Sequence, residues 1–137
     1  VESGCDVCYG PIGTYRCAGE RRKVDVEAVK TLDERGVTVA LITDSPLMSE
    51  VSLYHHLGEA VREGVPYLRA LRMVTINPAK ILGVEERLGS LAPGKDADLI
   101  LVKGRIGWDT DAQVRLTMID GHVVYVSGVE AEAASIP

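Results

Sequence analysis

The chain has 137 residues, of which 46% are hydrophobic and 26% are charged, and its formal net charge is −5. This length suits about one ordinary domain, and this balance is typical of globular proteins and excludes a disordered chain. The acidic charge argues against a nucleic-acid partner, and no apolar run approaches the roughly 20 residues that span a membrane.

The amino-terminal sequence, Val1-Glu-Ser-Gly-Cys5, has neither an initiator Met nor the pattern of a signal peptide. We therefore expect a cytoplasmic chain that was cut from something longer. Cys5 and Cys8 have the spacing of a zinc knuckle or a redox pair, and only Cys17 lies near them. Because a zinc site needs more ligands than these, we expect three unconnected thiols, with metal or redox use as the alternative.

The first part of the chain alternates between strand and helix patterns. A short strand is predicted at Asp6 to Tyr9, followed by a loop with two glycines and a proline, Gly10 to Arg16. Apolar residues at helical spacing predict a helix over Val24 to Arg35. The apolar run Val37 to Thr43, rich in β-branched residues, is typical of a buried parallel strand. Together these elements predict a βαβ unit.

Three helices are expected next. The first spans about Glu50 to Glu63, and the second spans Tyr67 to Val74 after Pro66. The third is short, from about Pro78 to Leu82, and Asn77-Pro78 is expected to mark the break between the last two helices.

From Leu88 onward, glycines and prolines separate short β-like runs, which are Ala97 to Val102, Val114 to Ile119 and Val123 to Val126. Asp120-Gly121 predicts a two-residue hairpin turn between the last two. We therefore divide the chain into an α/β part, about 1–84, a small antiparallel β part, about 85–127, and a fraying tail, 128–137.

Two long segments resemble the carboxyl-terminal signature of the amidohydrolase superfamily, whose members include imidazolonepropionase-like, dihydroorotase-like and deaminase enzymes. They are Val74-Thr-Ile-Asn-Pro-Ala-Lys-Ile-Leu-Gly83 and Arg87-Leu-Gly-Ser-Leu-Ala-Pro-Gly-Lys-Asp-Ala-Asp-Leu-Ile-Leu101. The resemblance extends from about Tyr9 to Tyr125. It implies a (β/α)8 TIM-type barrel with a metal site, and a small β-sandwich built from both ends of the chain. Residues 1–84 would be the last βα units of the barrel, and 85–127 the C-terminal half of the sandwich.

Asp44 is the main candidate for chemistry, because it follows the predicted buried strand at the end where barrel enzymes place their sites. From the residues alone, Asp44 would be a turn or helix-capping residue in Asp-Ser-Pro. The resemblance implies that it contacts the catalytic metal or its bound hydroxide and acts as the general base. Ser45 stands where the family often has His, and we expect it to cap the next helix.

The loop after the first strand supplies candidate substrate-binding residues. Thr14, Tyr15 and Arg16 offer a hydroxyl, a ring and a cation, and the alternative is a simple turn with a surface Arg. His55 and His56 are adjacent on a predicted helix and point about 100° apart, so they are poor joint metal ligands. His122 is expected to face solvent, and Trp108 and Met118 are expected to pack.

The family's site also needs a His-x-His pair and further upstream histidines, and this sequence has no His-x-His. A catalytic zinc needs about three protein ligands. We therefore expect zinc or iron in the intact enzyme and no metal in this chain alone. The sequence predicts a fragment, inactive in isolation, of an amidohydrolase that hydrolyses non-peptide C–N bonds of a small molecule such as a cyclic amide. It would need the missing N-terminal portion.

The alternative is a non-catalytic structural or interaction module with the same fold. In either case, two barrel strands and half a sandwich would leave edges unpaired. We therefore expect the isolated chain to form a homo-oligomer.

Overall fold

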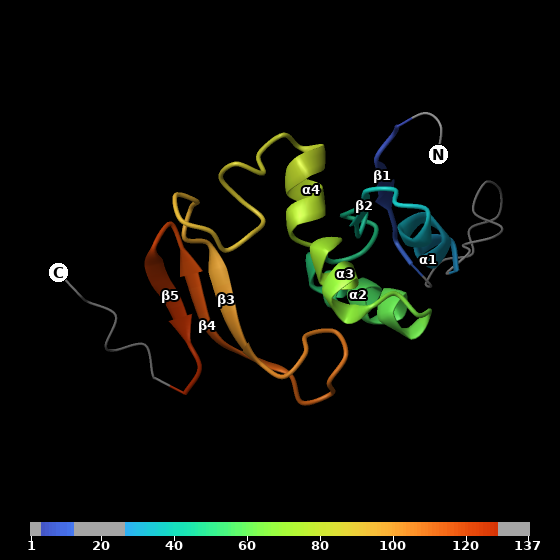
Figure 1. The fold of residues 1–137 in the computed structure, drawn as a ribbon. Helices are drawn as coiled ribbons and strands as arrows, with labels where there is room; N and C mark the ends of the chain where they lie inside the picture. The colour runs from blue at the N-terminus through green and yellow to red at the C-terminus, as the bar shows by residue number, and fades with distance from the viewer. Residues whose placement is uncertain (1–3, 13–26, 129–137) are drawn as a thin grey trace.

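Two sheets organise the chain, a parallel pair of strands near the amino terminus and an antiparallel sheet of three strands near the carboxyl terminus (Figure 1). The computed structural model describes residues 4–12 and 27–128. Its elements are β1 (Val7–Tyr9), α1 (Glu27–Glu34), β2 (Val39–Leu41), the 3-10 helix η1 (Glu50–Ser52), α2 (Leu53–Arg62), α3 (Tyr67–Arg72), α4 (Ile76–Ile81), β3 (Leu99–Lys103), β4 (Gln113–Ile119) and β5 (His122–Val126).

The predicted βαβ unit is confirmed. β1 and β2 pair in parallel, with Val7 opposite Val39 and Tyr9 opposite Leu41, and α1 lies between them in the chain. All three residues of β2 are buried, as the continuous apolar run predicted, although the paired strand is shorter than 37–43. Residues 24–26 of the predicted first helix lie outside the described residues.

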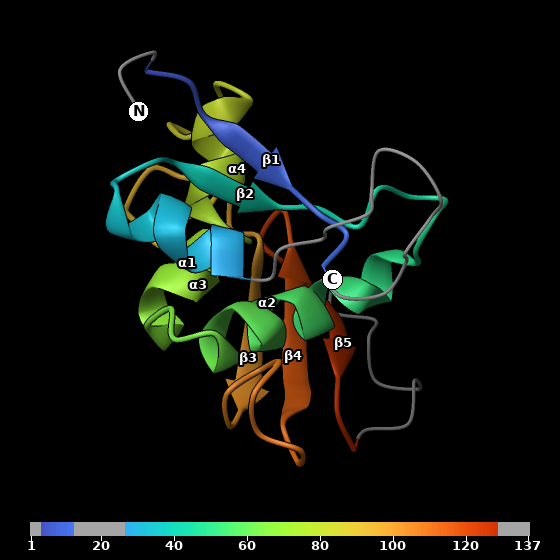
Figure 2. The ribbon, with the colours of Figure 1, turned by 90° about the vertical axis from the view of Figure 1, so that its right-hand side faces the viewer.

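The core lies between the parallel pair and the helices α1, α2 and α3, which lie below β1 and β2 in Figure 2. It is aliphatic, as the absence of Phe requires. Its fully buried members are Ile12, Val29, Val39, Leu41, Leu57, Ala60, Val65, Ala70 and Met73. None of the helices in the described part of the chain is long and apolar enough to cross a membrane.

Two predicted helix boundaries are wrong. α4 begins at Ile76, so Asn77 and Pro78 lie in its first turn and do not mark the break, which falls after Arg72. Proline is tolerated there because the first N–H groups of a helix have no partner within the helix. The helix predicted from Glu50 is divided, since η1 precedes α2.

The carboxyl-terminal sheet has the order β3-β4-β5. Its predicted hairpin is confirmed, because Asp120 (φ 50°) and Gly121 (φ 76°) both have the positive φ that a tight two-residue turn needs. All five residues of β5 are exposed, including three valines and a tyrosine. This strand therefore presents apolar side chains to solvent.

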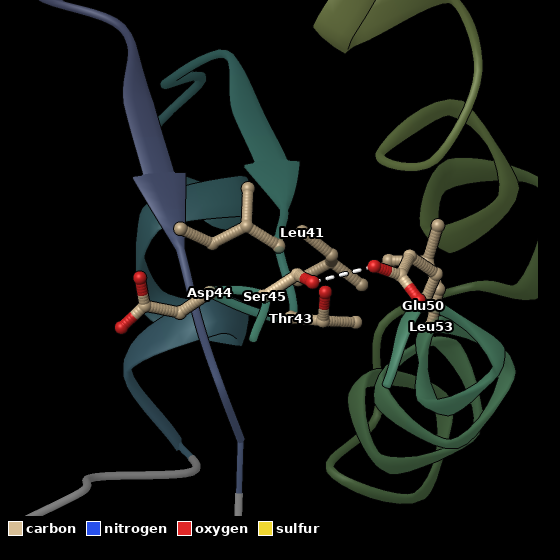
Figure 3. Close-up of a pocket in the computed structure, with 7 residues that line it drawn as sticks. Leu41, Thr43, Asp44, Ser45, Glu50 and Leu53 are labelled. Atoms are coloured by element: carbon tan, nitrogen blue, oxygen red, sulfur yellow. Dashed lines mark hydrogen bonds between the residues drawn. The ribbon is translucent and has the colours of Figure 1, made fainter. Parts of the chain in front are cut away.

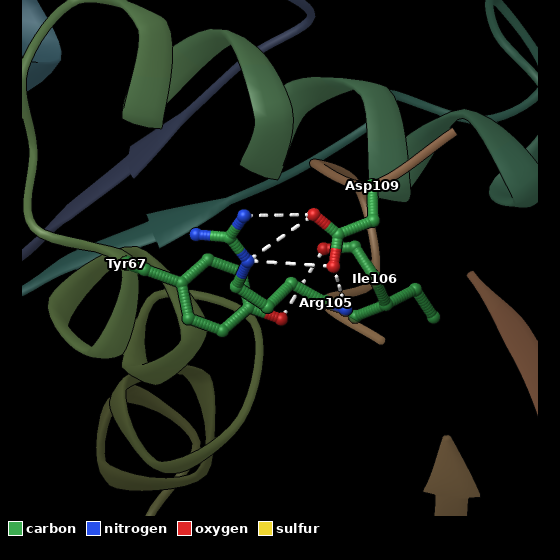
Figure 4. A network of polar contacts seen from close by, with 4 residues as sticks. All are labelled: Tyr67, Arg105, Ile106 and Asp109. Atoms are coloured by element: carbon green, nitrogen blue, oxygen red, sulfur yellow. Dashed lines mark hydrogen bonds and ion pairs between the residues drawn. The ribbon is translucent and has the colours of Figure 1, made fainter. Parts of the chain in front are cut away.

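The loop between β3 and β4 joins this sheet to the helices. Tyr67 of α3 donates a hydrogen bond from its hydroxyl to the carbonyl oxygen of Ile106 at 3.4 Å (Figure 4). Arg105 and Asp109 brace the same loop through an ion pair, in which Nε and Nη2 of Arg105 both donate to Oδ1 of Asp109, with the closest approach at 2.8 Å. Helix α3 and the loop between β3 and β4 are thus in direct contact.

Candidate active site

Asp44 follows β2 by three residues and lies at the end of the sheet where both parallel strands finish. Its side chain is exposed. A cavity of about 370 Å³ opens here, lined by Leu41, Ile42, Thr43, Asp44, Ser45, Glu50 and Leu53 (Figure 3). Asp44, which the sequence placed after a buried strand, therefore borders a hollow at the end of that strand.

The backbone at Asp44 is in the left-handed region, with φ of 55°. Aspartate tolerates this conformation better than most residues. The Asp44 carbonyl oxygen accepts a hydrogen bond from the N–H of Leu47 at 2.8 Å, which closes a turn over the cis Ser45–Pro46 peptide bond. This turn directs the Asp44 carboxylate to the opposite side of Ser45 from Glu50 (Figure 3).

Ser45 does not cap the following helix, and that prediction is wrong. The N-cap position of η1 belongs to Ser49, which makes no side-chain capping bond. Ser45 instead donates from its hydroxyl to Oε1 of Glu50 at 2.5 Å, and this bond holds the pKa of the Glu50 carboxyl below its ordinary value. Sequence reasoning missed Glu50 as a site residue, because no local pattern shows that the turn returns the chain to this position.

None of the other candidate residues that the structure describes lines this cavity. Thr14, Tyr15 and Arg16, proposed for substrate binding, lie outside the described residues, as does Cys17. Cys5 and Cys8 carry exposed thiols. His122 is exposed at the start of β5, as expected. Trp108 is more exposed than a packing residue should be, and the Arg105 guanidinium lies 5.8 Å from the centre of its ring.

The two adjacent histidines have different environments. His55 is exposed, whereas His56 is 1% exposed. Neither ring nitrogen of His56 has a hydrogen-bond partner within the described part of the chain. Burial lowers the pKa of the His56 imidazole, and His55 lowers it further, while Glu59 acts in the opposite direction.

The described residues do not make a metal site by themselves. Within residues 4–12 and 27–128, no group of three His, Cys, Asp or Glu side chains could hold a metal ion. Asp44 would supply one ligand at most, and a catalytic zinc needs about three. A metal at this position would therefore require ligands from elsewhere.

The model of the amidohydrolase family matches residues 2–124. The chain belongs to the amidohydrolase family. The resemblance seen in the sequence is thereby confirmed, and members of this family are generally metal-dependent.

Two curated relatives of this amidohydrolase chain are deaminases. A 5-methylthioadenosine/S-adenosylhomocysteine deaminase of Symbiobacterium thermophilum is 31% identical over 152 residues, covering 91% of this chain and 33% of the relative. An adenine deaminase of Clostridium botulinum is 36% identical over 83 residues, covering 61% of this chain and 13% of the relative. The chain thus spans about a third or less of the length of these relatives.

Solved structures give the same picture. An amidohydrolase from Thermotoga maritima MSB8 matches with a TM-score of 0.85 and 36% identity, over 91% of this chain and 32% of that one. A Xaa-Pro dipeptidase matches with a TM-score of 0.63 and 29% identity, over 74% of this chain and 25% of that one. The structural neighbours are TIM-barrel amidohydrolases, and this chain, like them, is mixed α/β.

Proposed function

We propose that this chain is the carboxyl-terminal third of a metal-dependent amidohydrolase that hydrolyses a non-peptide C–N bond of a small molecule. Residues 1–84 would form the last βα units of the barrel, and 85–127 would form the C-terminal half of a small β-sandwich. The observation that carries the proposal is the position of Asp44, which follows a buried parallel strand and borders a cavity. The family match over residues 2–124 supports a catalytic role for a residue at this position.

In this proposal Asp44 is the general base and a metal ligand. Its carboxylate takes a proton from the attacking water and later delivers that proton to the leaving nitrogen. A divalent metal, zinc or iron, would lower the pKa of that water when bound. The remaining metal ligands come from the N-terminal portion that the chain lacks relative to its family, so the chain is inactive in isolation.

Thr14, Tyr15 and Arg16 are the proposed substrate contacts. They follow β1 in the sequence. Because β1 and β2 are parallel, the carboxyl ends of both strands lie at the same end of the sheet. Arg16 suits a carboxylate or other anionic group on the substrate. The two deaminase relatives make amino-substituted purines reasonable probes, beside the cyclic amides that the sequence suggested.

The test compares this chain expressed alone with the same chain joined to its own upstream sequence. We expect the joined protein to contain stoichiometric zinc or iron by elemental analysis. We expect it to release ammonia from adenine or 5-methylthioadenosine, or to open a cyclic amide such as hydantoin. Asp44→Asn should lower kcat by about 10²–10⁴-fold. Stoichiometric metal in the isolated chain would contradict the proposal.

A non-catalytic structural or interaction module is the second candidate. The exposed apolar residues of β5 favour it, since contiguous exposed apolar surface commonly marks a binding surface. A joined protein that folds but carries no metal and hydrolyses none of these probes would favour this alternative.

A further inference from the structure

The strand that precedes Asp44 has two edges, and β1 occupies only one of them. On that side Ile42 donates from its N–H to the carbonyl oxygen of Tyr9 at 3.0 Å, and Val7 donates to Thr38 at 2.9 Å. Alternate residues of a strand direct their backbone groups to opposite edges. The backbone groups of Val39 and Leu41 therefore face the outer edge of β2, away from β1.

The junction between α3 and α4 makes two hydrogen bonds to this outer edge. Leu41 donates from its N–H to the carbonyl oxygen of Met73 at 2.9 Å. Asn77 donates from Nδ2 to the carbonyl oxygen of Val39, also at 2.9 Å. The Met73 carbonyl is thus the acceptor for the N–H of Leu41, and the Asn77 amide is the donor to the carbonyl of Val39. A strand paired with β2 would provide the same two kinds of group. Val39 and Met73 are fully buried, so water is not an easy substitute for either bond.

The motif Thr75-Ile-Asn-Pro-Ala79 has a physical role at each of its other fixed positions. The Thr75 hydroxyl donates to the carbonyl oxygen of Leu71 at 2.8 Å and so closes the end of α3. Pro78 fits the first turn of α4. Ala79 is buried beside Gly89, where an added Cβ would lie 2.8 Å from the Ala79 Cβ. The motif is therefore a joint between β2, the helices and the segment that leads to the second sheet.

We infer that Asn77 is a positioning residue for Asp44: its side-chain amide, together with the Met73 carbonyl, anchors the backbone of β2 at Val39 and Leu41. Asp44 follows Leu41 by only three residues, so the hydrogen bonds that fix β2 also fix the start of the turn that orients the carboxylate. The role of Asp44 rests on the function proposed above, whereas the hydrogen bonds to β2 do not.

The first test measures backbone hydrogen exchange by NMR in the isolated chain. Asn77→Ala should speed exchange of the Leu41 amide about ten-fold, the factor expected for one lost hydrogen bond, and should shift the amide signals of Thr43 and Asp44. Thr75→Val is the matched control, because it removes a side-chain hydrogen bond of the same junction that does not reach β2. Unchanged Leu41 exchange in Asn77→Ala, or equal changes in both variants, would overturn the inference.

The second test separates hydrogen-bond donation from space filling. In Asn77→Asp the protonated acid can donate to the Val39 carbonyl, whereas the carboxylate cannot. Relative to the unsubstituted chain, protection of Leu41 should be close to normal at about pH 4 and should fall about ten-fold near neutral pH. A ratio that does not change with pH would refute donation by residue 77.

If either variant fails to fold, the unsubstituted chain still decides the question. A scalar coupling across the hydrogen bond from Asn77 Nδ2 to the Val39 carbonyl carbon would support the inference, and its absence would overturn it. These readouts require neither metal nor turnover. The inference and the proposed function can therefore fail separately.

Discussion

Gly58 of α2 packs its backbone against the carbonyl oxygen of Gly107 in the loop between β3 and β4. A Cβ on Gly58 would lie 2.2 Å from that oxygen, and a Cβ on Gly107 would lie 2.4 Å from the carbonyl oxygen of Tyr54. Neither distance leaves room for any side chain. The contact between the helices and the second sheet therefore depends on glycine at both positions.

Gly58→Ala should lower the free energy of unfolding by about 1–3 kcal/mol, the usual cost of overpacking a close contact. The direction is informative, because Gly→Ala inside a helix otherwise stabilises by about 1 kcal/mol. Urea unfolding followed by circular dichroism measures the change. His55→Ala, an exposed substitution on the same helix, should change stability little. A Gly58→Ala chain at least as stable as the original would mean that the contact does not form in solution.

The stability of the chain should fall in mild acid because of His56. Its pKa is lowered in the folded state by burial, so below the unfolded value of about 6.5 the unfolded chain binds the proton more readily. Stability is therefore fully present above that pH and decreases as pH falls through this range. His56→Leu should reduce the decrease, measured as the urea midpoint at several pH values.

His55→Leu is the control for this titration, because His55 is the exposed neighbour on α2. It should leave most of the acid sensitivity in place. Equal effects of the two substitutions would show that burial of His56 is not the cause.

The backbone of Asp44 predicts which substitutions keep the fold. Asn tolerates a φ of 55° about as well as Asp, whereas Ala does so at a cost of about 1 kcal/mol. In the isolated chain Asp44→Asn should unfold at the same urea concentration as the original, and Asp44→Ala at a lower one. In the joined protein Asp44→Asn should lower kcat by about 10²–10⁴-fold with little change in KM. Retained turnover in a folded Asp44→Asn protein would remove Asp44 from the chemistry.

The exposed strand β5 should make the isolated chain self-associate. Val124 is 57% exposed and Tyr125 is 50% exposed on a strand that pairs only with β4 among the described residues. Sedimentation velocity should show dimers or larger species at micromolar concentration, and Val124→Lys should shift the chain toward monomer. Thr31→Lys, an exposed change on α1, should not. A monomeric unsubstituted chain would contradict this prediction.

The sequence by itself determined the features that depend on neighbouring residues. The apolar run through Val39 made a buried parallel strand, and Asp120-Gly121 made a tight hairpin turn, because period and turn residues act locally. The place of Asp44 at the end of that strand followed for the same reason. The family signature was equally readable, since it consists of contiguous residues.

Only the tertiary structure decided the contacts between segments that are remote in the chain. The bond from Asn77 to Val39 spans 38 residues, and it gives β2 a hydrogen-bond partner outside the sheet. The same holds for the approach of Gly58 to Gly107. Pattern reasoning assigned Asn77-Pro78 to a helix break, because a local rule cannot show that the first turn of α4 is needed at a strand edge. Such contacts arise from packing, and packing depends on shape in three dimensions.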